Sequence, residues 1–222
     1  MSIGPEIAEA PSARRRATRE RLLEAAAEVF TEAGLQGASV EAICSRAGFT
    51  RGAFYSNFES KEQLFLELLE REFDRRAAHL AEQAASLEPE LREQSGCLSP
   101  ELAARYIAEF FAPETEATTW FVLEAEFLLL AMRDPSIAPG HHAFMDRFYA
   151  GIADAVERVV EAAGRRFTLP VAHAMPVLSG IYERALRTAV LASSEEHEPD
   201  FDDLGDRLAE LLFAITEPLS AE

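Results

Sequence analysis

Residues 39–58 read SVEAICSRAGFTRGAFYSNF, and this stretch decides the fold of the N-terminal part of the chain. Ser39 is a good N-cap for a short helix over Val40–Ala47, because its hydroxyl can accept a backbone hydrogen bond from the first turn. Gly48 then ends that helix, since glycine takes a positive φ angle at low steric cost. Thr50 is again a good N-cap, and a second short helix follows it. Two short helices joined by such a tight turn predict a helix-turn-helix.

Helical periodicity extends from this motif in both directions. Apolar residues recur at three- and four-residue spacing, and Gly or Pro separates the helical segments. The sequence predicts helices over about residues 14–34, 40–47, 51–57, 61–86, 100–111, 114–133, 137–164, 170–193 and 201–217. The alternation typical of strands is absent from the sequence. We therefore expect an all-α protein, with the helix-turn-helix in an N-terminal head and the remaining helices in a larger body.

The same pattern predicts three parts. Residues 1–13 mix Pro, Gly, Ser and Ala without periodicity and are expected to form a mobile tail. Residues 14–75 are expected to form the head, with the helix-turn-helix at about residues 39–58. Residues 76–222 are expected to form the body.

The composition is that of an ordinary globular protein, since 48% of the 222 residues are hydrophobic and 27% are charged. No stretch approaches ~18 consecutive apolar residues, so no membrane span is expected. A Glu-rich amphipathic segment follows Arg14–Arg16 where a signal peptide would be apolar, so we expect a cytoplasmic protein. Cys44 and Cys97 have neither metal-ligand spacing nor a disulfide framework, and reduced thiols are expected.

The formal charge of −18 argues against nucleic-acid binding when taken as a sum, because DNA binding depends on neutralising phosphates. The charge is unevenly distributed, however. Residues 1–58 hold seven Arg and seven Glu, whereas residues 59–222 hold fourteen Lys and Arg against thirty-two Asp and Glu. A near-neutral head that carries arginines beside an acidic body would turn the head toward DNA. The distribution therefore permits DNA binding.

A longer stretch around the helix-turn-helix closely resembles the signature of the TetR family of transcriptional regulators. It comprises residues 19–30 (RERLLEAAAEVF), Gly34, residues 47–58 (AGFTRGAFYSNF) and Lys61, a little over a quarter of the chain. The resemblance implies a DNA-binding three-helix head on a body that binds a small effector. It also implies homodimerisation through the last two helices and release of DNA when the effector binds.

The resemblance assigns DNA contacts to Ser39, Thr50, Arg51, Gly52, Ala53, Tyr55, Ser56, Asn57 and Lys61. Thr50 would cap the recognition helix and hold a phosphate, and Arg51 would pair with a base edge or a phosphate. Gly52 would let the helix backbone approach the groove, and Ala53 would touch a thymine methyl group.

Phosphate contacts are implied for Ser39, Tyr55 and Lys61, the last being the only lysine of the chain. Arg14–Arg16 either supply a flexible arm that reaches DNA or form a solvated basic run. Many relatives carry His or Tyr at the positions of Ser56 and Asn57. Both residues here can still form hydrogen bonds, but the operator sequence is not carried over.

The resemblance also places an effector pocket among the middle helices, with candidate lining residues Phe110, Trp120, Phe127, Phe144, Phe148, Met175 and Tyr182. Trp120 and Tyr182 are favoured, since each combines an apolar ring with a polar group. Simple core packing is the alternative for each of these residues.

His142 and Asp146 lie one helical turn apart and suggest a metal, but no further ligand follows at a useful spacing. A capping or surface role is expected for His141 and His142 instead. No metal site and no cofactor are predicted.

The last two predicted helices carry broad apolar faces, which favour a self-complementary four-helix interface with two-fold symmetry. Burial in the core of a single chain is the alternative. A dimer fits DNA binding, because two recognition helices roughly 34–36 Å apart can read successive major grooves of a palindrome.

Together these patterns favour a ligand-responsive DNA-binding regulator, a repressor that binds a palindromic operator as a homodimer and is released by a small, largely apolar effector. An enzyme built on a helical bundle is the first alternative. The sequence holds no Gly-rich phosphate loop, nucleophile elbow, paired-carboxylate iron motif or His-Glu metal helix, so no catalytic residue is predicted. A helical adaptor without DNA binding is the second alternative, and Thr50, Tyr55 and Lys61 argue against it.

Overall fold

The computed structural model describes residues 13–94, 98–110, 117–192 and 202–219. It divides into two compact units, Met1–Leu69 and Glu70–Glu222. The helices are α1 (Ala13–Gly37), α2 (Val40–Ala47), α3 (Arg51–Tyr55), α4 (Lys61–Glu93), α5 (Pro100–Phe110), α6 (Ala117–Arg133), α7 (Ala138–Ala162), α8 (Val171–Ala192) and α9 (Asp202–Ile215). Two short strands are β1 (Arg165–Phe167) and β2 (Thr216–Pro218). The predicted all-α class is confirmed, and among the described helices none is long and apolar enough to cross a membrane.

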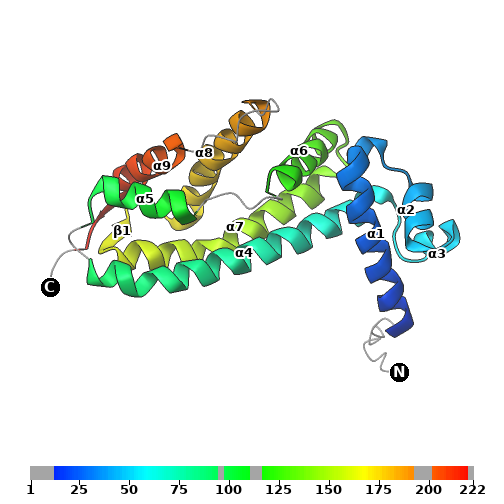
Figure 1. The fold of residues 1–222 in the computed structure, drawn as a ribbon, viewed down its shortest axis with the longest axis horizontal. Coiled ribbons are helices and arrows are strands. Elements are labelled where there is room, and N and C mark those ends of the chain that lie inside the picture. The colour runs from blue at the N-terminus through cyan, green and yellow to red at the C-terminus, as the bar shows by residue number, and fades with distance from the viewer. Residues whose placement is uncertain (1–12, 95–97, 111–116, 193–201, 220–222) are drawn as a thin grey trace, which may run out of the picture. The chain divides into compact units, whose positions relative to one another are not determined.

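The first unit is built around the aromatic and aliphatic residues of α1, α2, α3 and the start of α4 (Figure 1). Phe30 of α1 and Phe65 of α4 meet edge to face with their ring centroids 4.8 Å apart. Phe54 and Phe58, from α3 and the segment after it, are 0% and 1% exposed. The short helices α2 and α3 are therefore stabilised by a core shared with α1 and α4 rather than by their own hydrogen bonds.

The turn of the helix-turn-helix has the geometry expected from its residues. Ser39 Oγ accepts from the backbone N–H of Ala42, and Thr50 Oγ1 accepts from the backbone N–H of Ala53. Gly48 has φ 72°, which confirms the predicted left-handed turn. Cys44, four residues earlier, is 4% exposed and leaves room for the crossing of α2 and α3.

Two arginines of α1 tie the ends of α2 and α3 to the first helix. Arg19 donates to the carbonyl of Asn57 and to Glu67, and its guanidinium lies 4.2 Å from the centroid of the Phe58 ring. Arg21 donates to the carbonyl of Ala47 at 2.9 Å. These bonds satisfy carbonyls that a helix end leaves without an intrahelical partner.

Lys61 forms similar hydrogen bonds to backbone carbonyls at the other end of α1. Its Nζ donates to the carbonyls of Leu35 at 2.8 Å and of Ala38 at 2.9 Å. These carbonyls follow Gly34, where φ is 68° and the helical conformation is interrupted before one more turn reaches Gly37. The predicted end of α1 at Gly34 is therefore a kink, and Lys61 holds the chain beyond it.

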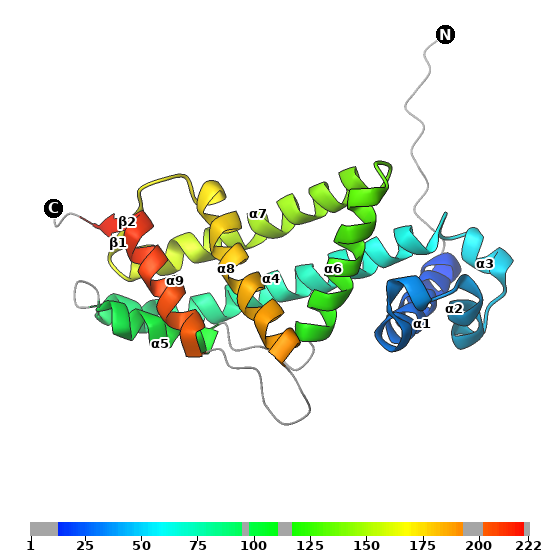
Figure 2. The ribbon, with the colours of Figure 1, turned by 90° about the horizontal axis from the view of Figure 1, so that it is seen from above.

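The second unit packs α4 and α7 side by side, with α5 against α9 (Figures 1 and 2). Phe73 of α4 contacts both Phe144 and Phe148 of α7, with ring centroids 4.8 and 4.9 Å apart. α4 runs past Pro89 to Glu93, so its predicted end near residue 86 is wrong. Leu91, 3% exposed, lies in the core, and its burial continues the helix past the proline.

A short antiparallel ribbon contradicts the expectation that the chain has no strand. β1 pairs with β2 in the register Arg165↔Pro218, Arg166↔Glu217 and Phe167↔Thr216. Gly164 precedes the ribbon with φ 74°, and Arg165 donates to the side chain and the carbonyl of Thr216. The predicted helices over 137–164 and 201–217 therefore end earlier, since three-residue strands are too short to show an alternating pattern.

Gly205 marks the closest approach of α5 and α9. A Cβ atom built at Gly205 would lie 2.4 Å from the carbonyl oxygen of Ala104, a backbone atom that cannot rotate away. We expect Gly205→Ala to lower the stability of the folded state by about 1–3 kcal/mol, because overpacking displaces the two helices. Thermal unfolding followed by circular dichroism measures the effect.

Gly151→Ala in α7 is the matched control, because a Cβ there would lie at an ordinary 3.6 Å from the Cβ of Ala77. This variant should keep the melting temperature or raise it, since Ala is favoured over Gly in a helix interior. Equal melting temperatures for both variants would contradict the close approach of α5 and α9.

Candidate nucleic-acid interface and effector cavity

The exposed face of α3 carries the candidate DNA contacts. Arg51 has a side chain that is 61% exposed, and Tyr55 is 50% exposed. Phe54 lies on the opposite face and is fully buried. Positions 51 and 55 share one face of a helix because they are one turn apart. The burial of Phe54 thus presents Arg51 and Tyr55 to solvent together.

Arg51 is held in a defined place on this surface. Its Nη1 lies 2.6 Å from Oε1 of Glu41 in α2, and its guanidinium lies 5.8 Å from the centroid of the Tyr55 ring. A hydrogen bond to Tyr55, and then the charge of Glu41, raise the pKa of Arg51. The pair is exposed and contributes little to stability. A phosphate or a base edge can therefore replace Glu41 at small cost.

Gly52 and Ala53 are the small residues of the same face. Gly52 is exposed, and a Cβ there would meet only Oγ1 of Thr50, at an ordinary 3.7 Å. Ala53 is half-buried and follows Gly52 in α3. The isolated fold has room for a larger residue at position 52. Any requirement for glycine there must come from something outside the fold.

Ser56 and Asn57 use their side chains on the end of α3 itself. The Ser56 hydroxyl donates to the carbonyl of Gly52 at 2.8 Å, and the Asn57 amide donates to that of Ala53 at 2.8 Å. Oδ1 of Asn57 is buried and has no hydrogen-bond partner within the described part of the chain. The helical conformation of α3 thus depends on groups that were expected to contact DNA.

Ser39, Thr50 and Lys61 also have structural contacts in addition to their expected contacts with DNA. The first two are exposed and cap α2 and α3. The Lys61 ammonium has three N–H bonds, and two of them donate to backbone carbonyls. Within the described part of the chain, the third is left for a further acceptor.

Sequence reasoning missed the structural role of the arginines in α1. Arg14–Arg16 lie within the helix rather than in a flexible arm, and Arg15 donates to the carbonyl of Ser56 at 3.2 Å. Arg19 is one turn further along and binds the carbonyl of Asn57. The four-residue spacing of Arg15 and Arg19 was the available signal, because it places both on one helix face.

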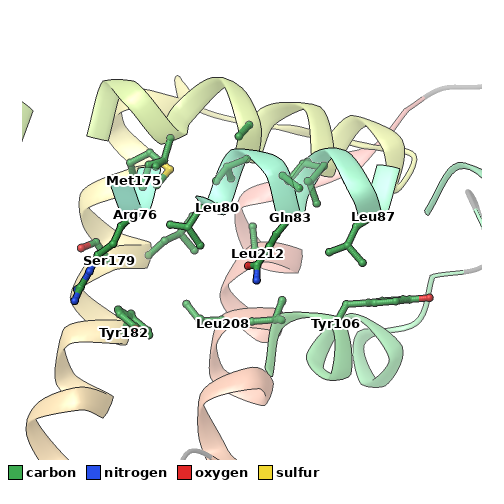
Figure 3. A pocket seen from close by; sticks show the side chains of 18 of the residues that line it. Arg76, Leu80, Gln83, Leu87, Tyr106, Met175, Ser179, Tyr182, Leu208 and Leu212 are labelled. Atoms are coloured by element: carbon green, nitrogen blue, oxygen red, sulfur yellow. The ribbon is translucent and has the colours of Figure 1, made fainter. Parts of the chain in front are cut away.

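A cavity of about 290 Å³ lies within the second unit, lined by α4 to α9 (Figure 3). Of the predicted lining residues, Phe148, Met175 and Tyr182 line it. The side chain of Phe110 lies outside the described residues. Trp120, Phe127 and Phe144 do not line this cavity.

Phe127 and Phe144 lie in the core beside His141 rather than along the cavity. Phe127 and Phe144 are 1% and 2% exposed, and their ring centroids lie 6.0 and 6.1 Å from that of His141. His141 is itself 9% exposed, so the surface role expected for it is wrong, whereas His142 is exposed as expected. Its Nε2 lies 2.8 Å from Oε1 of Glu124, which lines the cavity. Within the described ranges, no group of three or more His, Cys, Asp or Glu could hold a metal ion.

Comparisons with known proteins agree with this arrangement. Residues 22–68 match the model of the tetR family of bacterial regulatory proteins. The HTH-type transcriptional regulator YdgC of Bacillus subtilis is 45% identical over 65 residues, 29% of this chain and 33% of that protein. The HTH-type transcriptional activator FasR of Mycolicibacterium smegmatis is 41% identical over 56 residues, 25% of this chain and 26% of that protein. The match thus spans about a third or less of these relatives.

Solved structures are similar over nearly the whole chain. The reduced form of NemR from Escherichia coli has a TM-score of 0.57 at 18% identity, covering 92% of this chain and 100% of that one. FadR from Bacillus subtilis, in complex with stearoyl-CoA, has a TM-score of 0.58 at 16% identity, covering 87% and 96%. Residues 22–68 thus match the tetR family of bacterial regulatory proteins, and the chain as a whole has the fold of these solved structures.

Proposed function

We propose that this protein is a transcriptional regulator that binds operator DNA through α3 and responds to a small effector bound in its second unit. The observation that carries the proposal is the face of α3, on which Arg51, Gly52 and Tyr55 are exposed above the buried Phe54. An arginine, a small residue and a phenol suit a helix that enters a major groove. Relatives that match the same segment are named HTH-type transcriptional regulators.

Self-association fits the same proposal. Exposed apolar side chains lie on α6 (Val122, Leu128, Leu129 and Met132) and on α8 (Val177 and Leu191). A patch of this kind supports a homodimer, in which two copies of α3 bind the halves of a palindrome. On α9, Leu204 and Leu208 are 3% and 2% exposed, so packing within one chain already buries part of the apolar face that was expected at the interface.

The sign of regulation is proposed to be repression, with release by a largely apolar effector. The apolar lining of the 290 Å³ cavity supports such an effector. Relatives that match the head include the repressor AcnR of Corynebacterium diphtheriae and the activator FasR, so the head alone does not determine the sign. Because coupling between sites is reciprocal, operator DNA should weaken effector binding by the factor by which effector weakens DNA binding.

The direct test is selection of fragments from sheared source DNA by the purified full-length protein, followed by mobility-shift titration. We expect sequence-selective binding by a dimer. Raising the salt from 50 to 200 mM should weaken that binding by roughly 10³-fold or more, as counterion release requires for several phosphate contacts. Failure to bind any fragment at low salt would favour a helical adaptor.

Gly52→Ala separates the requirements of DNA binding from those of folding. The melting temperature should be unchanged or higher, because the new Cβ meets only an ordinary contact with Thr50. Affinity for all DNA should fall about tenfold or more, since a methyl group in a close contact costs roughly 1–3 kcal/mol. Unchanged affinity would mean that the backbone at position 52 does not approach the groove.

Arg51→Ala and Tyr55→Phe should affect DNA binding in different ways. If Arg51 pairs with a base, its loss should weaken operator binding by roughly ten- to a hundredfold and weaken random-sequence binding much less. Tyr55→Phe removes only a hydroxyl and should weaken both by the same factor. Titrations of each variant against both DNAs check this, with melting temperature and dimer mass as controls. Equal losses from Arg51→Ala on both DNAs would exclude base reading by Arg51.

A further inference from the structure

Two polar side chains of α4 enter the cavity of the second unit without satisfying all of their hydrogen bonds. Nη2 of Arg76 and Oε1 of Gln83 are buried, and neither has a hydrogen-bond partner within the described ranges. Both residues line the cavity, and Figure 3 shows both side chains projecting from α4 toward α8 and α9. Buried polar atoms are almost always paired in folded proteins, so two orphans in one cavity require an explanation.

Arg76 is fixed in place by one of its nitrogens. Its Nε donates to Oε1 of Glu72 at 2.8 Å, while Arg75 donates to both oxygens of the same carboxylate at 2.8 and 3.1 Å. Burial acts to raise the pKa of Glu72, but hydrogen bonds from the two arginines outweigh it and lower the pKa, which keeps the carboxylate ionised. One carboxylate faces two guanidiniums. The contact with Glu72 uses Nε of Arg76, so Nη2 of Arg76 is left for another acceptor.

Two other carboxylates of the cavity wall already have partners. Glu124 contacts Nε2 of His141 at 2.8 Å, and Glu183 accepts from the hydroxyl of Ser179 at 2.9 Å. Neither carboxylate forms a hydrogen bond with Nη2 of Arg76. An oxygen acceptor from outside the chain can thus be bound by Arg76 without displacing an existing contact.

Gln83 lies seven residues after Arg76, two helical turns along the same face of α4. The rise of an α-helix separates the two positions by about 10 Å. Leu80, Leu87, Leu208 and Leu212 line the cavity around them. Arg76 and Gln83 thus lie at the two ends of an apolar stretch about 10 Å long. Such a stretch suits a ligand with an apolar middle and a polar group at each end.

We propose that the effector is a linear apolar molecule with an oxygen acceptor at one end, bound by Arg76, and a hydroxyl group about 10 Å away, bound by Gln83. The proposal rests on the proposed function only in taking this cavity as the effector site. A volume of about 290 Å³ lies at the lower end of the range for small-molecule sites, which suits a slender ligand. A chain of about eight carbons with one oxygen function at each end fits both the length and the volume.

The test uses the full-length protein without DNA and four probes: 8-hydroxyoctanoate, octanoate, 1,8-octanediol and 1-octanol. Isothermal titration should give tighter binding, by about tenfold, for each probe with two polar ends than for its partner with one. Comparison of the hydroxy acid with the diol distinguishes a carboxylate from a neutral oxygen at Arg76. No binding of any probe, or equal binding of one-ended and two-ended probes, would overturn the proposal.

Gln83→Leu gives the decisive variant. It should abolish the preference for the two-ended probes while leaving the dissociation constant of octanoate within about twofold. Its melting temperature without ligand should equal or exceed that of the unmodified protein, because an apolar group replaces an unsatisfied oxygen. A melting temperature lowered by several degrees, or a preference that survives, would show that Gln83 serves the fold instead.

Gln36→Leu is the matched control, since Gln36 is exposed in α1 and lies in the other unit. It should change neither the affinity nor the preference for any probe. Failure of this inference is distinguishable from failure of the proposed function. If the protein binds operator DNA but none of the probes, only the proposed ligand class is overturned. If it binds the probes in the predicted pattern but binds no DNA, only the proposed function as a DNA-binding regulator is overturned.

Discussion

The burial of Phe54 and Phe58 is the constraint on which the first unit depends. α3 has only five residues, and a helix that short does not form in water by itself. Both rings are at most 1% exposed, and each contributes roughly 1.5–3 kcal/mol by leaving water. Because Phe54 points inward, Arg51 and Tyr55 must point outward. The same interaction therefore forms the helix and orients its exposed face.

Hydrogen bonds from basic side chains to backbone carbonyls then fix the segments that the aromatic core does not hold. Arg15 and Arg19 bind carbonyls at the end of α3, and Lys61 binds those that follow the kink of α1. Each tie joins segments more than twenty residues apart, so the three helices of the head hold one arrangement. A rigid head suits recognition of DNA, because contacts with base edges tolerate little error in position.

The sequence predicted the head well because its signals are local. Ser39, Gly48 and Thr50 act within four residues of themselves, so caps and turn could be read directly. Long-range contacts were not predictable in the same way. Burial of Leu91 carries α4 past Pro89, and the contacts of Arg165 with Thr216 form a ribbon between segments fifty residues apart. Of the six predicted lining residues whose side chains the structure describes, three line the cavity, since hydrophobicity alone does not distinguish a cavity wall from a packed core.

Residues that a fold does not require are the better guide to function, and both units contain them. Gly52 occupies a position where the isolated head has room for a side chain. Arg76 and Gln83 bring polar atoms into an apolar cavity that aliphatic residues would fill at lower cost. By contrast, Phe127 and Phe144 are buried in the core, with His141 beside both rings and Phe73 against Phe144, although their residue type made them attractive candidates. A ligand is therefore expected in the cavity of the second unit, where Arg76 and Gln83 bring together polar atoms that folding leaves without partners.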